Sequence, residues 1–340
     1  MKIDLHTHIL PEKLPDLEKR YGYGGFTSIE HYAPCCARLF KNGEFFREID
    51  DRCWSPLRRL EDCDHDGVGV QALSTVPVMF SYWAEPADGH DLSRLLNDHI
   101  AGVVRDHPGR FIGLGTLPLQ DPQLAIEEME RCRGELGFPG VQIGTHCGEW
   151  NLDDPALFPV FENAARTGVS MFVHPWEMLG EERMPSYFLP WLVGMPAETS
   201  LAICSLIFGG VLERLPDLKI CFAHGGGSFL PTLARIEKGW IARPDLCQVN
   251  TSTSPSGYLD RFYIDSLVHD ERSLLALIDQ MGPNRIALGS DYPFPLGEDQ
   301  PGSLIDSMKS IDDDVRERLL SGTALEFLGL EGKIVEKLGS

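Results

Sequence analysis

The sequence predicts an α/β fold, a (β/α)8 barrel with a small antiparallel β insertion after its first strand. Short apolar runs alternate with segments of helical periodicity along most of the 340 residues, as expected for a parallel sheet that is covered by helices. Four of these runs carry histidine or aspartate at or just beyond their ends. Functional side chains of such barrels lie at the carboxyl ends of the strands, so both observations favour the same fold.

Eight apolar runs have the character of strands that are buried on both faces. A (β/α)8 barrel needs that number of strands. The expected strands are residues 3–5, 70–75, 111–117, 141–145, 171–173, 219–223, 262–265 and 286–289.

Most of the segments between these strands place apolar residues every three or four positions, which is the spacing of one helix face. The expected helices are residues 56–66, 92–106, 123–135, 156–166, 198–214, 231–238 and 271–280, followed by a helical stretch over 303–327. Because strands and helices alternate throughout, we expect one barrel domain over residues 1–340.

Residues 11–55 interrupt the alternation. Within them, Asn42-Gly43 joins two short apolar-rich runs, and this dipeptide supplies the positive φ angles of a type I′ hairpin turn. We therefore expect a small antiparallel β insertion within residues 11–55, beside the mouth of the barrel.

Composition restricts the class of protein. The formal charge of −21 argues against binding to nucleic acid, whose phosphates require clustered Lys and Arg. The N-terminus lacks a signal-peptide pattern and no stretch approaches about 18 apolar residues, so we expect a cytoplasmic protein without a membrane span. The nine cysteines include no Cys-x-x-Cys, which predicts reduced, buried thiols and disfavours a thiolate metal site.

The pair His6-x-His8 is half of a candidate metal site. Residues i and i+2 of a strand point to the same side, so both imidazoles can reach one ion, and neutral imidazole nitrogen is a common ligand of Zn²⁺. Three further strand ends carry His174, His224 and Asp291. We expect these five side chains to converge at one end of the barrel.

Other catalytic motifs are absent. His224 precedes three glycines, as in the oxyanion loops of esterases, but no Gly-x-Ser-x-Gly nucleophile motif is present, which argues against a serine hydrolase. No Gly-x-Gly-x-x-Gly opens a helix, so a nicotinamide cofactor lacks support. The fourth strand lacks the lysine that bridges two metals in many barrel enzymes, which favours one metal. His146 is a spare candidate ligand, for which we expect a supporting structural role.

The order of His6-x-His8, His174, His224 and Asp291 resembles the amidohydrolase superfamily. Longer segments resemble, nearly end to end, the 2-amino-3-carboxymuconate-6-semialdehyde decarboxylase family within it. The segments are residues 75–83, 113–118, 137–146, 189–199 and 291–297. The resemblance implies a TIM-type barrel that decarboxylates this semialdehyde without oxidant, as a carboxy-lyase of tryptophan (kynurenine) or nitroaromatic catabolism. It implies one Zn²⁺ per subunit, no organic cofactor and 2-aminomuconate semialdehyde and CO2 as products.

The same resemblance implies roles for individual residues. His6, His8, His174 and Asp291 are the implied zinc ligands, with a water completing the shell, and His224 is the implied general base. Zinc lowers the pKa of such a water from about 16 towards 7, so that a histidine can take its proton near neutral pH.

The resemblance also implies a substrate pocket. Arg47, Trp191, Arg235, Arg243 and Phe294 are the implied substrate contacts. Guanidinium groups suit a substrate that carries carboxylates, although ordinary surface charge remains the alternative for each arginine. Arg235 and Arg243 resemble residues that reach into the neighbouring site of family dimers, so we expect a homodimer with shared arginines.

Two alternative functions stay open at this point. A hydrolase or lactonase of the same superfamily would use the same ligands and base on a related carboxylate, and only its products would differ. A non-catalytic zinc-binding protein would keep the metal site but would lose nothing measurable when His224 is replaced.

Overall fold

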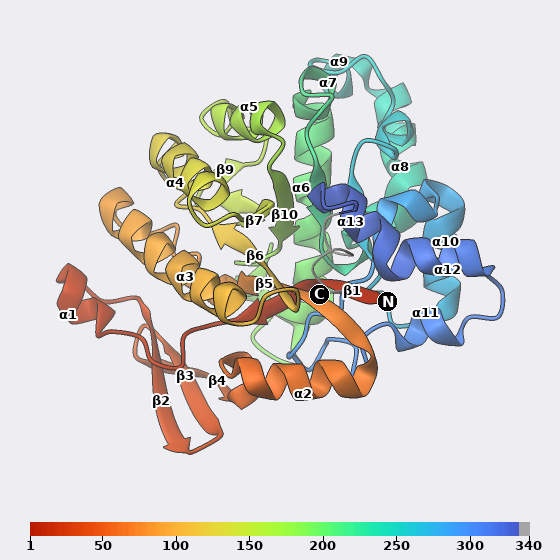
Figure 1. Ribbon diagram of the computed structural model, residues 1–340. Coiled ribbons are helices and arrows are strands. Elements are labelled where there is room, and N and C mark those ends of the chain that lie inside the picture. Colours follow the sequence, from red (N-terminus) through yellow and green to blue (C-terminus); the bar gives the residue numbers. More distant parts are fainter. Residues whose placement is uncertain (333–340) are drawn as a thin grey trace.

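The computed structural model describes residues 1–332 and confirms the predicted fold class, an eight-stranded parallel barrel surrounded by helices (Figure 1). The strand order is β1-β5-β6-β7-β10-β11-β12-β13. The strands are Lys2–Ile9 (β1), Val68–Thr75 (β5), Phe111–Thr116 (β6), Gly140–Gly144 (β7), Ser170–His174 (β10), Ile220–Phe222 (β11), Tyr263–Asp265 (β12) and Ile286–Ala287 (β13). Each overlaps one of the expected strands.

Backbone hydrogen bonds between β1 and the segment that follows β13 close the barrel. The Leu5 amide donates to Leu288 O over 2.8 Å, and the His8 amide donates to Tyr292 O over 2.8 Å. The Asp291 amide donates in the opposite direction, to His6 O, over 2.9 Å. The first and last strands therefore lie side by side, which brings residues near 6 and 291 together.

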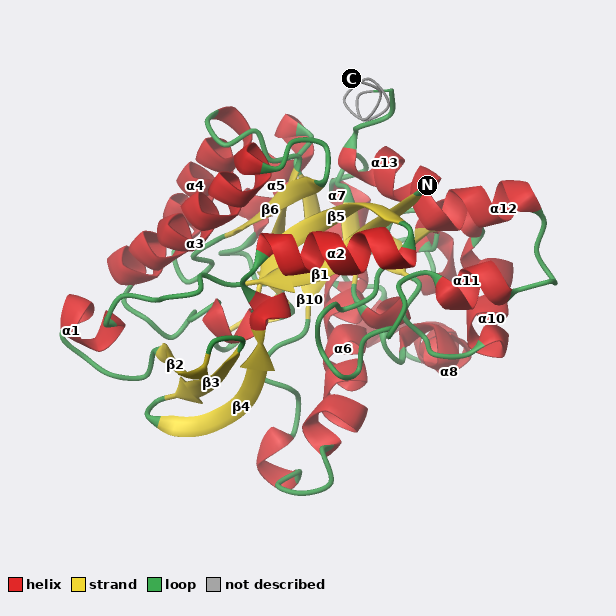
Figure 2. Ribbon diagram, turned by 60° about the horizontal axis from the view of Figure 1, so that its bottom comes forward, coloured by secondary structure: helices red, strands yellow, loops and turns green. Residues whose placement is uncertain are grey.

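Helices cover the outside of the barrel (Figures 1 and 2). The helices of the described residues are α1 (Leu17–Tyr21), α2 (Pro56–Asp66), α3 (Pro86–Asp106), α4 (Pro122–Gly134), α5 (Phe158–Thr167), α6 (Met195–Phe208), α7 (Val211–Arg214), α8 (Phe229–Ala242), α9 (Pro244–Cys247), α10 (Glu271–Met281), α11 (Ser303–Ser307), α12 (Asp313–Glu317) and α13 (Thr323–Leu328). The short helix α1 lies away from the barrel strands. Helix α2 has the predicted bounds because its ends carry strong local signals. Ser55 caps it, Pro56 begins it, and Gly67 ends it with φ of 71°, as capping preferences require.

Two expected helices are interrupted. The stretch 198–214 contains α6 and α7, because Gly209 and Gly210 separate them and Gly210 has φ of 73°. The stretch 303–327 contains α11, α12 and α13, and the side chain of Asp312 caps the start of α12. Helical periodicity continued across both breaks and did not reveal them.

The insertion is a three-stranded antiparallel sheet of β2 (Thr27–Ala33), β3 (Cys36–Lys41) and β4 (Glu44–Asp50). The predicted hairpin is β3 and β4, and its turn residues Asn42 and Gly43 have φ of 54° and 75°. The third strand, β2, was not expected. Figure 2 shows the sheet apart from the barrel, with β4 running towards it. The predicted domain extent of 1–340 stays a prediction, since residues 333–340 lie outside the described range.

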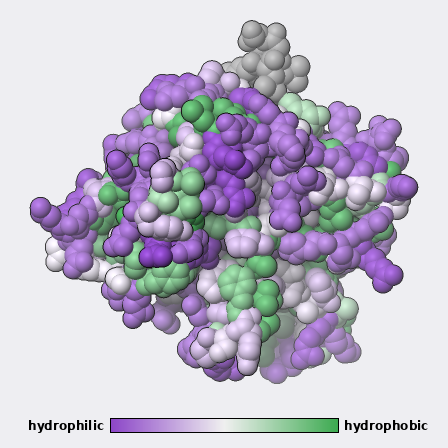
Figure 3. All heavy atoms as spheres, turned by 90° about the horizontal axis from the view of Figure 1, so that it is seen from below, coloured by the Kyte–Doolittle hydropathy of each residue, from purple (hydrophilic) through white to green (hydrophobic). Residues whose placement is uncertain are grey.

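The surface and one apolar helix bear on the composition argument. Hydrophilic residues cover most of the face in Figure 3, and hydrophobic residues gather near its centre and lower part. Among the described residues, Pro190–Phe208 is long and apolar enough to cross a membrane by composition, and half of it is buried inside the protein. A core helix of a soluble protein has the same character. The sequence analysis, which expected no stretch of about 18 apolar residues, did not identify this segment.

The nine cysteines are all free thiols. The expectation that they are buried is wrong for Cys35, which is exposed, and Cys36, Cys204 and Cys247 are only partly buried. Cys35 lies in the turn between β2 and β3, and an exposed turn has no core to cover it.

Candidate metal centre

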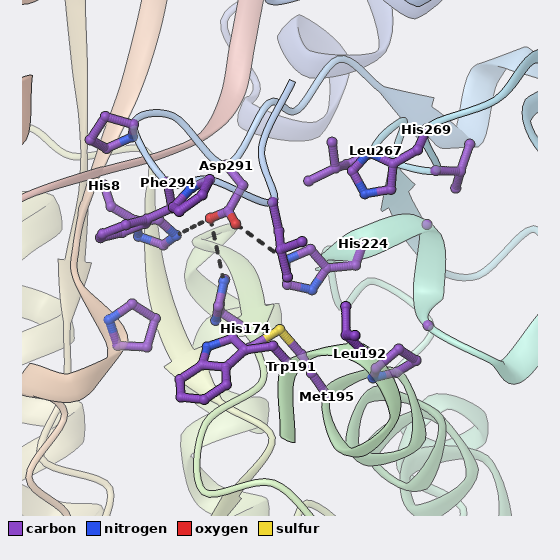
Figure 4. A pocket seen from close by; sticks show the side chains of 18 of the residues that line it. His8, His174, Trp191, Leu192, Met195, His224, Leu267, His269, Asp291 and Phe294 are labelled. Carbon is purple, nitrogen blue, oxygen red and sulfur yellow. Dashed lines mark ion pairs between the residues drawn. The ribbon is translucent and has the colours of Figure 1, made fainter. Parts of the chain in front are cut away.

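Four predicted ligands converge at the carboxyl end of the barrel strands, and Figure 4 shows three of them, His8, His174 and Asp291. His6 and His8 lie on β1, His174 ends β10, and Asp291 follows β13. One ligand atom from each residue lies within 4.8 Å of all the others. The Nε2 atoms of His6 and His8 are 3.1 Å apart, and Asp291 Oδ1 lies 3.3 Å and 3.0 Å from them.

Each of these histidines has an acceptor at its other ring nitrogen. His6 Nδ1 lies 2.7 Å from Asp265 Oδ2, and His8 Nδ1 lies 3.1 Å from the Thr75 carbonyl oxygen. His174 Nδ1 lies 2.9 Å from its neighbouring carbonyl oxygen, that of Pro175. A proton on each Nδ1 satisfies these contacts and leaves the Nε2 lone pairs directed at one another. Hydrogen bonds of this kind to the outer ring nitrogen orient metal-binding imidazoles.

The arrangement fits a divalent cation. Three nitrogen lone pairs and a carboxylate oxygen at such short distances repel one another unless a cation or a proton lies between them. His174 Nε2 and Asp291 Oδ1 are buried and have no hydrogen-bond partner, although buried polar atoms are almost always paired. Three imidazoles and one carboxylate, with space for a further ligand, are a donor set suited to a catalytic transition metal.

The pKa shifts of three side chains favour the protonation states that bind a metal, which are neutral histidine and ionised aspartate. Burial lowers the pKa of His8, and it lowers the pKa of His174 well below its ordinary value, so both rings stay neutral. Burial raises the pKa of Asp291, but the adjacent imidazoles of His174, His224 and His6 outweigh it and hold this pKa well below its usual range. The carboxylate therefore stays ionised, as metal binding requires.

His6 differs from the other two histidines. Burial lowers its pKa, but hydrogen bonds to Asp265 and Asp291 outweigh this and raise the pKa to about 10. These two carboxylates therefore favour a proton at His6 Nε2, the ring nitrogen that faces the other ligands. A metal ion that binds here displaces that proton, so metal binding and proton release are coupled.

His224 lies beside the ligand group but outside it. It follows β11, its φ is 57°, and its Nε2 lies 3.8 Å from Asp291 Oδ2. Its ring centroid is 5.0 Å from that of His174, and its buried Nδ1 has no hydrogen-bond partner. This is a suitable position for a group that exchanges a proton with a molecule held at the centre.

Asp265 is a functional candidate that sequence reasoning missed. It ends β12, and besides its bond to His6 it accepts hydrogen bonds from the backbone amides of His224 (2.9 Å), Gly225 (2.8 Å) and Leu267 (3.1 Å). One carboxylate thereby orients a ligand and the segment that carries the base. The available signal was its place at the end of an expected strand, as for the other site residues.

We predict that Asp265→Asn weakens metal binding about 10- to 100-fold, the usual cost of removing the hydrogen-bond partner of a metal-binding histidine. Asparagine offers one acceptor oxygen where four donors converge, so the His6 ring loses its fixed orientation. Competition with a chromophoric chelator measures the affinity. Asp245→Asn, which removes an exposed carboxylate paired with Arg243, is the matched control. Unchanged affinity in folded Asp265→Asn protein would refute the prediction.

A cavity of about 940 Å³ opens over the centre, and His8, His174, His224 and Asp291 lie at its base. Its aromatic walls are Phe46, Trp176, Phe188, Trp191 and Phe294. Figure 4 shows Trp191 and Phe294 on opposite sides of the histidine cluster. The cavity could therefore enclose a flat, conjugated molecule between rings.

Arg47 on β4 also lines the cavity. Its guanidinium carbon lies 4.5 Å from the ring centroid of Phe46 and 4.9 Å from that of Phe294. Among the described residues, no carboxylate lies within ion-pair distance of it and no side-chain hydrogen bond involves it. Burial lowers its pKa, but a guanidinium stays protonated in proteins. An anionic ligand would therefore find an unpaired cation in an apolar wall.

The other predicted residues lie elsewhere. Arg235 and Arg243 are exposed and do not line the cavity of their own chain, and Arg243 is paired with Asp245 at 2.7 Å. His146 is not in the ligand group. Its ring nitrogens lie 2.9 Å from Gly148 O and 3.1 Å from Glu177 O, so its contacts join two loops.

Comparison with known proteins gives the family. The sequence model of the family described as Amidohydrolase matches residues 3–330. The chain belongs to the amidohydrolases. Two relatives of this amidohydrolase are named 2-amino-3-carboxymuconate-6-semialdehyde decarboxylase. The one from Dictyostelium discoideum is 57% identical over 97% of this chain and 92% of its own length. The one from Caenorhabditis elegans is 36% identical over 98% and 96%.

A solved structure extends the likeness to the fold. The dihydroxybenzoic acid decarboxylase of Polaromonas sp. JS666, with bound manganese and an inhibitor, superposes with a TM-score of 0.77. It is 23% identical in sequence, and the match covers 97% of each chain.

Proposed function

We propose that this amidohydrolase is a mononuclear zinc decarboxylase that converts 2-amino-3-carboxymuconate-6-semialdehyde to 2-aminomuconate semialdehyde and CO2. The observation that carries the proposal is the group of His6, His8, His174 and Asp291, with His224 beside it, at the base of a cavity that holds Arg47. The two relatives of that name support the same substrate, since each matches nearly the whole chain.

The residues of the cavity have separate roles in the proposed reaction. A zinc ion held by the four ligands would supply a Lewis acid that makes a water molecule acidic near neutral pH. His224 accepts a proton from water at Nε2, which faces Asp291, and donates it to the substrate carbon whose bond to the carboxylate breaks as CO2 leaves. Arg47 pairs with a substrate carboxylate and thereby sets the orientation of the carbon skeleton. Trp191 and Phe294 enclose the conjugated skeleton and exclude water from it.

Zinc is the metal that we propose, with one ion per subunit and no organic cofactor. Three imidazole nitrogens suit zinc, and its affinity for such sites exceeds that of manganese in the usual order of divalent metals. The related structure with manganese shows that this fold also accepts that ion in another protein. Metal analysis of the protein as purified, followed by reconstitution with each ion, distinguishes the two.

The decisive experiment measures CO2 released from freshly generated aminocarboxymuconate semialdehyde by zinc-loaded and by metal-stripped protein. The spontaneous cyclisation of the substrate is subtracted. We expect CO2 from the zinc-loaded sample alone. A metal-replete protein that releases no CO2 would contradict the proposal. If the same protein opened a lactone of a related carboxylate, the hydrolase alternative would replace it.

We also propose a homodimer in which Arg235 and Arg243 serve the partner's cavity. Both are exposed and lie outside the cavity of their own chain. The same region, α8 and α9 with the residues that follow, exposes the apolar side chains of Ile241, Leu246 and Val249 by more than 60% each, as an interface would. A cytoplasmic location and a role in tryptophan or nitroaromatic catabolism stay predictions.

Mixing two inactive variants tests the sharing of arginines. We predict that Arg47→Ala mixed with Arg243→Ala recovers activity, because random pairing leaves about a quarter of the sites intact if one arginine comes from each subunit of a two-fold dimer. Turnover after verified subunit exchange is the measurement. Arg47→Ala mixed with His224→Ala is the matched control, since both residues serve the cavity of one chain and no complete site can form. Equal recovery in both mixtures, or none in either, contradicts sharing.

A further inference from the structure

Arg59 on α2 is fully buried and charged, and it is not used by the proposed reaction. No carboxylate among the described residues lies within ion-pair distance of its guanidinium. Instead, the guanidinium donates hydrogen bonds to four neutral oxygens. These are His8 O at 2.6 Å, Thr7 Oγ1 at 2.9 Å, Arg52 O at 3.1 Å and Gln71 Oε1 at 3.1 Å.

Burying this charge is costly, so fold stability alone is a poor reason for it. Even a buried ion pair can often be replaced by apolar side chains of similar volume without loss of stability. What an apolar side chain cannot do is hold several oxygens in a fixed relative geometry, which a planar guanidinium with five N–H donors does. The positions of those oxygens therefore indicate what Arg59 does.

Two of the four oxygens belong to the end of β1 that carries the histidine ligands. His8 O is the carbonyl of a ligand residue, and Thr7 stands between the two ligands His6 and His8. Thr7 Oγ1 in turn donates to Ala72 O on β5 over 2.7 Å. The Arg59 guanidinium thus holds the ligand-bearing end of β1 against α2 and the neighbouring strand.

A face of the guanidinium, rather than its N–H edge, contacts the segment that carries Asp291. The Arg59 guanidinium carbon lies 4.7 Å from the ring centroid of Tyr292, the residue after Asp291. Tyr292 also donates its hydroxyl to Asp62 Oδ2 on the same helix, over 2.7 Å. Asp291 has φ of 58°, a left-handed conformation that persists only where the surroundings hold it. Helix α2 supplies two such restraints.

We propose that Arg59 is a positioning residue of the metal centre, which fixes the His8 segment of β1 relative to the Asp291 segment that follows β13. The inference rests on the proposed metal site. Arg59 does not line the cavity, so it acts through the ligands and does not touch substrate.

The test measures the metal in the absence of substrate. Arg59→Met removes the guanidinium fork, and Arg59→Lys keeps a charge with a single nitrogen. We expect Arg59→Met to weaken zinc binding about 10- to 100-fold and to change the visible absorption of the cobalt-substituted protein, which reports coordination geometry. The zinc affinity of Arg59→Lys should fall between that of Arg59→Met and that of the unmodified protein. Folded Arg59→Met protein with unchanged zinc affinity and an unchanged cobalt spectrum overturns the proposal.

Arg131→Met is the matched control for general destabilisation. Arg131 is also enclosed, with 8% of its side chain exposed, but it pairs with Glu128 and Asp98, which are not in the ligand group. We expect it to lower the melting temperature and to leave zinc affinity unchanged. An equal loss of zinc affinity in both methionine variants overturns the proposal.

A second variant decides the question if Arg59→Met does not fold. Tyr292→Leu removes the ring that stacks on Arg59 and the hydroxyl that reaches Asp62, and we expect the same direction of change in affinity and spectrum. Unchanged values overturn the proposal. If the unmodified protein binds no zinc, the proposed metal centre fails as well. If it binds zinc tightly and the Arg59 and Tyr292 variants do too, only this inference fails.

Discussion

His224→Ala is expected to retain its zinc and to lose about 10²- to 10⁴-fold in turnover, the usual contribution of a general acid or base. The histidine lies next to the four ligands, with its Nε2 3.8 Å from Asp291 Oδ2, but it is not a member of the ligand group. Its backbone amide is held by Asp265 at 2.9 Å. Removing the imidazole therefore removes a proton acceptor and leaves the donors of the metal in place.

Two measurements on one sample check this expectation. Metal content after exhaustive dialysis shows whether zinc is retained, and CO2 release shows the loss of turnover. His146→Ala is a suitable control, because His146 is also a strand-end histidine but hydrogen-bonds only to loop carbonyls. If His224→Ala lost zinc and turnover together, His224 would be a ligand. If it kept full turnover, the non-catalytic alternative would gain support.

Asp291→Ala is expected to lose both its zinc and all measurable turnover. Asp291 Oδ1 lies 3.3 Å, 3.0 Å and 3.9 Å from the Nε2 atoms of His6, His8 and His174, so it is the one ligand that faces all three imidazoles. It also supplies the negative charge of the ligand set. Without it, three neutral or partly protonated rings remain, and protonated His6 would repel a cation.

Asp291→Asn separates charge from shape in this experiment. The amide keeps the side-chain volume and an oxygen donor but removes the charge, so we expect zinc to be lost here too. Alanine adds a second cost, because φ of 58° at this position is tolerated better by Asp and Asn than by other residues with a Cβ. Undiminished zinc in folded Asp291→Asn protein would show that another residue completes the site.

Local signals explain which elements could be predicted. The eight barrel strands were recognisable because a strand that is covered on both faces is apolar throughout. Helix α2 was bounded by Ser55, Pro56 and Gly67, and the β3–β4 turn by Asn42-Gly43, each of which acts within a few residues. Strand β2 was missed because most of its side chains are exposed and no apolar periodicity marks it.

The site was recognisable as a set of residue types at strand ends, not as a geometry. His6, His8, His174, His224 and Asp291 were named because a parallel barrel brings all its strand ends to one face. Asp265 shared that position but was overlooked, because an acidic residue at a strand end has no single interpretation in the sequence. Arg59 lies within a helix and showed no signal at all.

The sequence by itself determined the barrel, its eight strands and the histidine and aspartate residues at the strand ends, because apolar runs and helical periodicity alternate along the chain and mark where each strand ends. Only the tertiary structure decided which of those residues share one centre, that Asp265 orients His6, and that Arg59 joins the segments of His8 and Asp291. The reason is physical. The contact between His6 and Asp265 spans 259 positions of the chain. Hydrogen bonds between residues so far apart arise from the closure of the barrel, and no local sequence pattern predicts them.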